Sequence, residues 1–246
     1  MSRIKRLQKK FEKLYIDAFL VTDEKNIYYL TGFNLMEGDG CLLVTKDNAI
    51  IITDDRYQLA LEEFENDEVV GMITRDYYGS LNKICQGMKV TVLGYEDTVT
   101  YALFDVFDEQ MAADLVPFHQ QLERMRMIKD SDEVNALRAS ADLHSAGYQY
   151  LLENVHAGMT ERHVANLLDF WMKEPHATAS KKVIEDGDIV TVDFGYYFNG
   201  YTADMTRTFA VGSIDPELRD VYQIVNEARE AVIQAAHVGQ RGDQLD

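Results

Sequence analysis

The strongest constraint on the fold is the dipeptide Asn199-Gly200, which stands between two runs of alternating apolar and polar residues, DIVTVDFGYYF and YTADMTRTFAV. Asn-Gly favours the turn of a two-residue β-hairpin loop, because both residues tolerate positive φ angles. With such a loop Phe198 pairs with Tyr201, and this pair sets the register of the whole hairpin. The sequence therefore predicts a long antiparallel hairpin over residues 188–211.

This register assigns every hairpin residue to one face, since side chains alternate along a strand. One face is polar and contains Thr191, Asp193, Gly195, Tyr197, Thr202, Asp204, Thr206 and Thr208. The other face is apolar apart from Arg207 and contains Val190, Val192, Phe194, Tyr196, Tyr201, Ala203, Met205 and Phe209. The apolar face is expected to pack on a core. A polar face of this kind often simply meets water.

Two carboxylates of the polar face, Asp193 and Asp204, are diagonal neighbours with backbones roughly 7–8 Å apart. Both can reach ions lodged between them, because paired metal ions lie about 3.5–4 Å apart. Gly195 stands opposite Asp204 and leaves room for an ion, while Thr206 stands opposite Asp193 and can hold that carboxylate. The pattern thus predicts either a metal site or a solvated strip, and a single bulge would move Asp204 to the other face.

Strands and helices alternate in the N-terminal half of the chain, which is typical of a small α/β domain. Predicted strands cover residues 18–21, 41–44, 49–52 and 90–93, and predicted helices cover residues 3–15, 57–64 and 81–86. Asp55 is expected to cap the helix that follows the third strand. Pro117 and the polar residues after it mark a boundary, so we expect one domain over residues 1–122 and a second over residues 123–246.

The second domain is predicted to contain three helices besides the hairpin. Ser131 is the expected N-cap of the first, Thr160 and Glu161 begin the second, and Asp215-Pro216 begins the third. The first and third end in His-x-Gly, at residues 156–158 and 237–239, which is a short internal repeat.

The charge of the chain limits its possible partners, and its cysteine content and lack of long apolar runs indicate its location. The chain has 24 basic and 42 acidic residues and a formal net charge of −18, which excludes nucleic acid and anionic membranes as favoured partners. There is no apolar run long enough to span a membrane and no signal-peptide pattern at the N-terminus. Cys41 and Cys85 have apolar neighbours and are expected to be buried, reduced and inert. The cytoplasm is the expected location.

Several segments resemble the pita-bread metallopeptidases, specifically the aminopeptidase P and proline dipeptidase branch. The aspartate of VDFG is followed eleven residues later by the aspartate of ADMTRT, and PHATASKKVIEDGD upstream is similar to the PHG-type segment of that family. In the N-terminal half, NIYYLTGF and TDDRYQLALEEF are similar to the smaller domain of the same branch. The resemblance implies a creatinase-like α/β N-terminal domain followed by an α+β pita-bread catalytic domain.

The resemblance also implies an activity: hydrolysis of the bond before proline, in Xaa-Pro dipeptides or N-terminal Xaa-Pro of peptides, at a dinuclear metal centre. Asp193 and Asp204 would be metal ligands, with Asp204 bridging both ions, and Thr206 would support them. His176 would steady the substrate or the tetrahedral intermediate. Carboxylate ligands favour manganese, with cobalt or zinc as alternatives. A homodimer is implied as well.

Histidines need an interpretation of their own. Without the resemblance, the sequence pattern alone predicts that His176 is an exposed residue in a loop after Pro175. The remaining histidines are expected at the surface or at helix ends, and they are His119, His144, His156, His163 and His237.

Two departures from the family matter. The family completes its site with a histidine and two glutamates from its second half, and those motifs are absent from this sequence, which ends at Asp246. Trp171–Glu174 also passes directly into Pro175, where the family has a further strand-bearing stretch. We therefore expect a partly present pita-bread domain that is catalytically incompetent as it stands. Two other functions stay open: a creatinase-like hydrolase that needs no metal, and a non-catalytic peptide- or protein-binding module.

Overall fold

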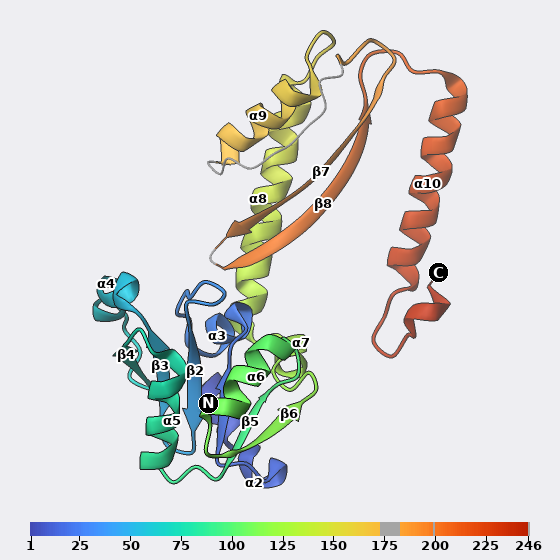
Figure 1. Ribbon diagram of the computed structural model, residues 1–246. Coiled ribbons are helices and arrows are strands. Elements are labelled where there is room, and N and C mark those ends of the chain that lie inside the picture. Colours follow the sequence, from blue (N-terminus) through green and yellow to red (C-terminus); the bar gives the residue numbers. More distant parts are fainter. Residues whose placement is uncertain (173–182, 199, 246) are drawn as a thin grey trace. The chain divides into compact units, whose positions relative to one another are not determined.

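The computed structural model describes residues 1–172, 183–198 and 200–245. It divides into two compact units, Met1–Ile128 and Lys129–Asp246 (Figure 1). The domain boundary expected between residues 122 and 123 lies at the start of the short helix α7 (Glu123–Met127) and stays a prediction.

A six-stranded mixed sheet forms the centre of the first unit. Its strands, in spatial order, are β4 (Val69–Ile73), β3 (Ala49–Thr53), β2 (Gly40–Thr45), β1 (Ala18–Val21), β5 (Val92–Glu96) and β6 (Asp114–Phe118). The pairs β1–β2 and β2–β3 are antiparallel, whereas β1–β5, β3–β4 and β5–β6 are parallel. The predicted α/β class of this half is confirmed, and all four predicted strands are present.

The two edge strands, β4 and β6, were not predicted. β4 has the sequence VVGMI, and Gly71 inside it weakens the strand pattern. β6 contains Pro117, which is tolerated at a sheet edge but reads as a turn signal in a sequence. β4 is partly exposed along its length.

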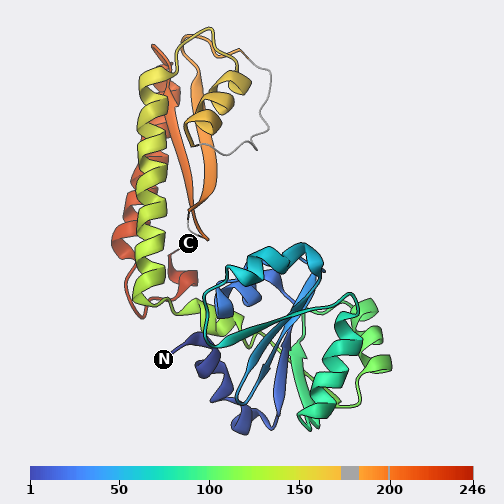
Figure 2. The ribbon, with the colours of Figure 1, turned by 90° about the vertical axis from the view of Figure 1, so that its left-hand side faces the viewer.

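The helices of the first unit cover both faces of this sheet (Figure 2). They are α1 (Arg3–Gln8), α2 (Phe11–Leu14), α3 (Glu24–Thr31), α4 (Gln58–Glu62), α5 (Tyr77–Gly87), α6 (Tyr101–Gln110) and α7, with a 3-10 turn at Asp55–Tyr57. The single helix predicted over residues 3–15 is two helices, and α3 and α6 were not predicted. The expected cap was wrong: Asp54, not Asp55, accepts the hydrogen bond from the Arg56 amide, because Asp54 is the first residue beyond β3.

Alternation along the buried strands divides the core into two clusters. Phe19, Leu42 and Ile51 point to one face of the sheet, and their sequence neighbours Leu20 and Leu43 point to the other. Cys41 and Cys85 lie in the second cluster as free, buried thiols. Burial raises the pKa of Cys41 to about 12 and that of Cys85 to about 11. Both thiols are therefore unreactive at neutral pH, as expected.

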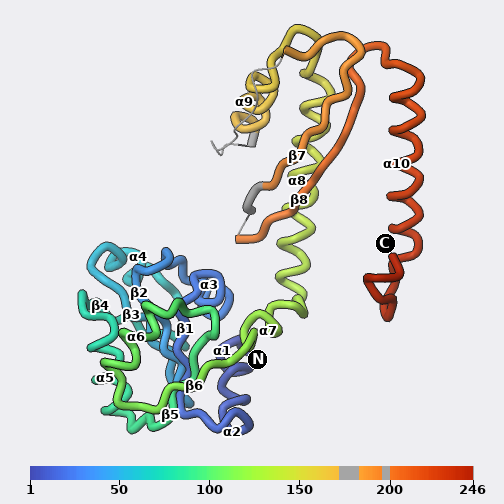
Figure 3. The backbone as a smooth tube through the Cα atoms, turned by 45° about the vertical axis from the view of Figure 1, so that its right-hand side comes forward, coloured from blue at the N-terminus to red at the C-terminus, as the bar shows by residue number. Residues whose placement is uncertain are grey.

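The second unit pairs a long helix with the hairpin. Its elements are α8 (Ser131–Asn154), α9 (Glu161–Met172), β7 (Ile189–Phe198), β8 (Tyr201–Ala210), α10 (Pro216–Ala235) and a 3-10 turn at Gly242–Gln244. α8 lies along both hairpin strands (Figure 3). None of the helices in the described part of the chain has the length and apolar character needed to cross a membrane.

The helix ends of this unit are determined by capping residues and by glycines close to them in the sequence. The expected N-cap Ser131 was wrong: Asp130 caps α8 in a capping box, in which its side chain binds the Glu133 amide and Glu133 binds the Asp130 amide. α10 begins as predicted, with Asp215 as the N-cap before Pro216. Gly158 and Gly239, the glycines of the two His-x-Gly segments, share nearly equal positive φ angles of 95° and 92°.

Candidate metal centre

The hairpin has the register that the Asn-Gly turn predicts. Phe198 pairs with Tyr201, Asp193 with Thr206 and Gly195 with Asp204, and the pairing continues without a bulge from Ile189↔Ala210 to the turn. Asp193 and Asp204 therefore lie on the same face of the two strands, as diagonal neighbours.

The two faces differ in exposure as expected. On the polar face, the exposed residues with described side chains are Thr191, Asp193, Gly195, Thr202, Asp204 and Thr206. On the apolar face, the half-buried residues are Val190, Val192, Phe194, Tyr201, Ala203, Met205 and Phe209. Several of these pack on a small core formed by Leu151, Val164, Leu168, Ile184 and Val211.

Hydroxyl groups order the polar face. Thr206 Oγ1 donates a 2.6 Å hydrogen bond to Asp193 Oδ1. Farther from the turn, the Thr191 and Thr208 hydroxyls lie 3.0 Å apart and share a hydrogen bond. Asp193 thus has the cross-strand partner predicted for it, and in the described part of the chain its second oxygen remains available to a ligand.

Gly195 leaves the surface beside Asp204 bare. A Cβ atom at this position would lie 3.1 Å from the Ala203 carbonyl oxygen and 3.6 Å from Thr202 Oγ1, so any side chain there would occupy the space next to Asp204. The missing side chain and the two carboxylates together leave room for a cation on this face. Within the described residues, no group of three or more His, Cys, Asp or Glu side chains gathers as a metal site.

The back of the hairpin is held by residues of α8 that were not predicted to support the site. Ser140 Oγ accepts a 2.9 Å hydrogen bond from the Ala203 amide, the His144 ring stacks on Phe194, and Tyr148 meets Phe209 edge to face. Their spacing of four residues is the signal that could have indicated a common helix face.

His144 corrects an expectation. It was expected at the surface or at a helix end, but it is fully buried between α8 and β7. The helical pattern shows that a residue belongs to one face, and only the packing of the hairpin on that face decides its burial.

The other predicted histidines fall into two groups. His176 lies outside the described residues. The four remaining histidines are exposed as expected: His119, His156, His163 and His237.

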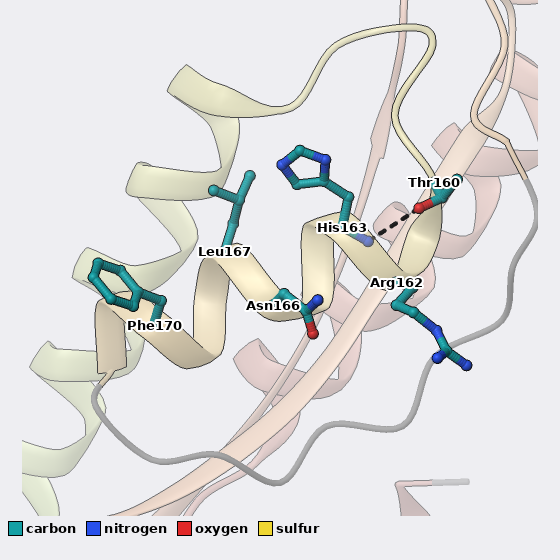
Figure 4. Close-up of a pocket in the computed structure, with 6 residues that line it drawn as sticks. All are labelled: Thr160, Arg162, His163, Asn166, Leu167 and Phe170. Atoms are coloured by element: carbon teal, nitrogen blue, oxygen red, sulfur yellow. Dashed lines mark hydrogen bonds between the residues drawn. The ribbon is translucent and has the colours of Figure 1, made fainter.

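Two surface hollows bring together no predicted site residue. One lies on α9 and is lined by Thr160, Arg162, His163, Asn166, Leu167 and Phe170, whose polar side chains point to different sides (Figure 4). The other lies in the first unit beside Asp54, where Arg56 and Tyr77 donate hydrogen bonds to the carboxylate. These charges are already paired, so they serve the local structure.

Comparisons with known families and proteins support the family resemblance that the sequence motifs indicate. The model of the creatinase/prolidase N-terminal domain matches residues 3–128, and that of metallopeptidase family M24 matches residues 172–246. A Bacillus subtilis protein described as the uncharacterised peptidase YqhT is 31% identical over 270 aligned positions, which cover 99% of this chain and 75% of that protein. The Xaa-Pro dipeptidase of Pyrococcus furiosus is 27% identical, with 99% of this chain and 74% of that protein covered.

Solved structures show the same relationship. The Xaa-Pro dipeptidase from Bacillus anthracis superimposes with a TM-score of 0.86 at 32% identity, covering 99% of this chain and 74% of that one. The X-Pro aminopeptidase from Thermotoga maritima gives a TM-score of 0.88 at 27% identity, covering 100% of this chain and 75% of that one.

The alignments also show that this chain and its relatives differ in extent. About a quarter of each relative has no counterpart in this chain. The 270 aligned positions of the Bacillus subtilis relative exceed the 246 residues of this chain, so that relative has additional residues inside the aligned region. With both family models matched in order along the sequence, this chain belongs to metallopeptidase family M24, in the group whose pita-bread domain follows a creatinase/prolidase N-terminal domain.

Proposed function

We propose that this protein hydrolyses the peptide bond that precedes proline, in Xaa-Pro dipeptides or at the N-terminus of longer peptides, with two divalent metal ions. The observation that carries the proposal is the hairpin register, with Asp193 and Asp204 on one exposed face and Thr206 bound to the first. Membership of the M24 family and the names of relatives, Xaa-Pro dipeptidases and an X-Pro aminopeptidase, support the substrate class.

The donors on this face fit a hard divalent ion. Asp193, Asp204 and the neighbouring threonines present oxygen atoms only, and oxygen ligands suit manganese better than they suit thiolate-seeking metals. Cobalt and zinc are the alternatives. Bound metal ions would supply an activated water and polarise the scissile carbonyl group.

The side chains of this chain have separate tasks in the proposed site. Thr206 holds one oxygen of Asp193 and so sets the direction in which the other oxygen points. Among the described residues no hydrogen bond occupies the oxygens of Asp204, and a bridging carboxylate needs both of them for metal. His176 would bind the substrate carbonyl group or the intermediate, a role that rests on the PHG-like segment around it.

Location and assembly complete the proposal: a homodimer in the cytoplasm. The two free, buried thiols fit a reducing compartment, since disulfides are rare there. The homodimer rests on the resemblance alone.

The test is a hydrolysis assay on the complete gene product with an Xaa-Pro dipeptide and a longer peptide that begins Xaa-Pro. We expect activity with added Mn²⁺ and loss of activity after chelation. Preference for the dipeptide or the longer peptide would assign dipeptidase or aminopeptidase activity. Hydrolysis that is indifferent to the chelator would contradict the proposal, and metal-independent hydrolysis of creatine would favour the creatinase-like alternative.

A substitution sharpens the assay. Asp204→Asn is expected to remove Mn²⁺ binding and peptidase activity while the melting temperature changes little, because the side chain is exposed. Asp220→Asn is the matched control, since Asp220 is an exposed aspartate of the same unit on α10. Unchanged metal content in the Asp204→Asn variant would contradict the proposal that Asp204 binds metal. A protein that binds peptide without cleaving it would support the non-catalytic module instead.

A further inference from the structure

The two proposed metal carboxylates are supported differently on the exposed face of the hairpin. Asp193 is held from the side by Thr206 at 2.6 Å. In the described part of the chain Asp204 has no hydrogen-bond partner of this kind, and Gly195 opposite it has no side chain to confine it. The position of Asp204 therefore depends on how the backbone of β8 is held.

The backbone of β8 is held from behind, by α8. Ala203, the residue directly before Asp204, donates its amide hydrogen to Ser140 Oγ at 2.9 Å. Ser140 is fully buried, so no water replaces this contact readily. The side chains of Ala203 and Asp204 point to opposite faces of the hairpin. The contact with Ser140 therefore fixes the strand from which Asp204 projects and leaves the polar face open.

His144, one helical turn after Ser140, supports the other strand. Its ring lies 5.3 Å from that of Phe194 at an interplanar angle of 20°, and Phe194 directly follows Asp193. His144 Nδ1 lies 2.6 Å from the Ser140 carbonyl oxygen. A carbonyl oxygen only accepts hydrogen bonds, so Nδ1 carries the hydrogen and the ring is fixed to the same turn of α8.

We propose that Ser140 is a positioning residue of the metal centre, which sets the place of Asp204 through the Ala203 amide, with His144 bracing the opposite strand. Ser140 touches neither metal nor substrate in this role. The inference rests on the metal-dependent function proposed above. It predicts that the hydroxyl matters for metal affinity beyond its contribution to folding.

The test is Mn²⁺ titration calorimetry on the complete gene product with substitutions on α8. Ser140→Ala is expected to weaken Mn²⁺ binding about 10-fold, the lower end of the effect of removing groups that orient metal ligands. Ser140→Cys keeps the packing but accepts hydrogen bonds poorly, and it serves if the alanine variant does not fold. Ser145→Ala is the matched control, because Ser145 is exposed and its hydroxyl binds the Ala141 carbonyl of its own helix.

A second control separates positioning from stability. Val164→Ala removes a buried side chain from the small core behind the hairpin but removes no hydrogen bond to β8, so it should lower the melting temperature while leaving Mn²⁺ affinity unchanged. Equal weakening in Val164→Ala and Ser140→Ala would overturn the inference, and so would wild-type affinity in both Ser140 variants. If Asp204→Asn abolishes binding in that case, the metal site survives and only the positioning role falls. If the unsubstituted protein binds no Mn²⁺, both proposals fall.

Discussion

One carboxylate of the first unit and two carboxylates of the hairpin in the second unit are held in opposite ways. In the first unit Glu96 is buried and accepts hydrogen bonds from the amides of Thr22 and Asp23 and from Asn26 Nδ2. In the second unit Asp193 and Asp204 are exposed, and one threonine hydroxyl is the partner described for the pair. A buried charge without partners would cost the fold too much, whereas an exposed carboxylate can keep its lone pairs for a ligand.

This difference separates stability from binding along the chain. Substitutions in the first unit should change the free energy of unfolding and leave metal affinity alone. Substitutions on the polar face of the hairpin should do the reverse. Four predictions test this separation.

The largest effect is expected for Phe107→Ala in the first unit. Phe107 is fully buried and its ring centre lies 5.0 Å from that of Tyr78. The cavity should lower the free energy of unfolding by about 3–5 kcal/mol, measured by urea unfolding followed with circular dichroism. Tyr101→Ala, at an exposed position of the same helix, should cost under about 0.5 kcal/mol. Weaker Mn²⁺ binding by the folded Phe107→Ala variant would contradict the separation between stability in the first unit and metal binding in the second.

Asn26→Leu is expected to follow. Its amide group donates to Glu96 at 2.8 Å and to Glu123 at 2.6 Å, and its oxygen accepts from Arg126 at 3.0 Å. Leucine leaves these charged groups without their shared partner, so unfolding should become easier by about 3 kcal/mol in the same assay. Asn34→Leu, at an exposed site, is the control. A cost equal to that of the control would mean that the buried network contributes nothing to stability.

Thr206→Val should act on binding instead. Valine has a similar shape and suits a strand, but it cannot donate to Asp193. Mn²⁺ affinity should fall about 10-fold, equivalent to about 1.4 kcal/mol, with little change in melting temperature. Thr202→Val changes a threonine of the same face that binds the Ala203 carbonyl oxygen rather than a carboxylate. If both variants lose affinity equally, the role of Thr206 is not specific.

The smallest effect is expected for Asp17→Asn and depends on pH. Hydrogen bonds from the Thr91 hydroxyl and amide hold the pKa of Asp17 well below its usual range. A lowered pKa in the folded state means that the stabilisation is present above about pH 4 and is lost as the pH falls below that value.

The variant should therefore be less stable than the unsubstituted protein by about 1 kcal/mol at pH 7, and the difference should shrink in urea titrations at lower pH. Asp67→Asn, at an exposed position, should show no such convergence. A difference that grows toward low pH would reverse the assigned sign.

Prediction from the sequence succeeded where a rule acts over a few neighbouring residues. The Asn199-Gly200 turn and the alternation around it predicted every pair of the hairpin, and the Asp215-Pro216 start of α10 was also correct. Prediction failed where two adjacent residues could both cap the same helix. Asp130 and Ser131 are both capable caps, and only the reciprocal contact with Glu133 selects the first.

It also failed where burial depends on a distant partner. His144 occupies a helix whose sequence does not show which segment will pack on it, so its burial beneath Phe194 was not foreseen. The edge strand β6 pairs in parallel with β5, and neither the pairing nor the crossover through α6 has a local signature.

The sequence by itself determined that Asp193 and Asp204 share a face, because the period of two and the turn geometry are properties of a short stretch of backbone. Only the tertiary structure decided what stands behind that face. Ser140 is 63 residues from Ala203 along the chain, and the contact between them exists because α8 folds back along the hairpin. The Thr206 partner of Asp193 follows from the hairpin register alone. The support of Asp204 does not, because the contact between Ser140 and Ala203 joins two segments that only the packing of α8 brings together.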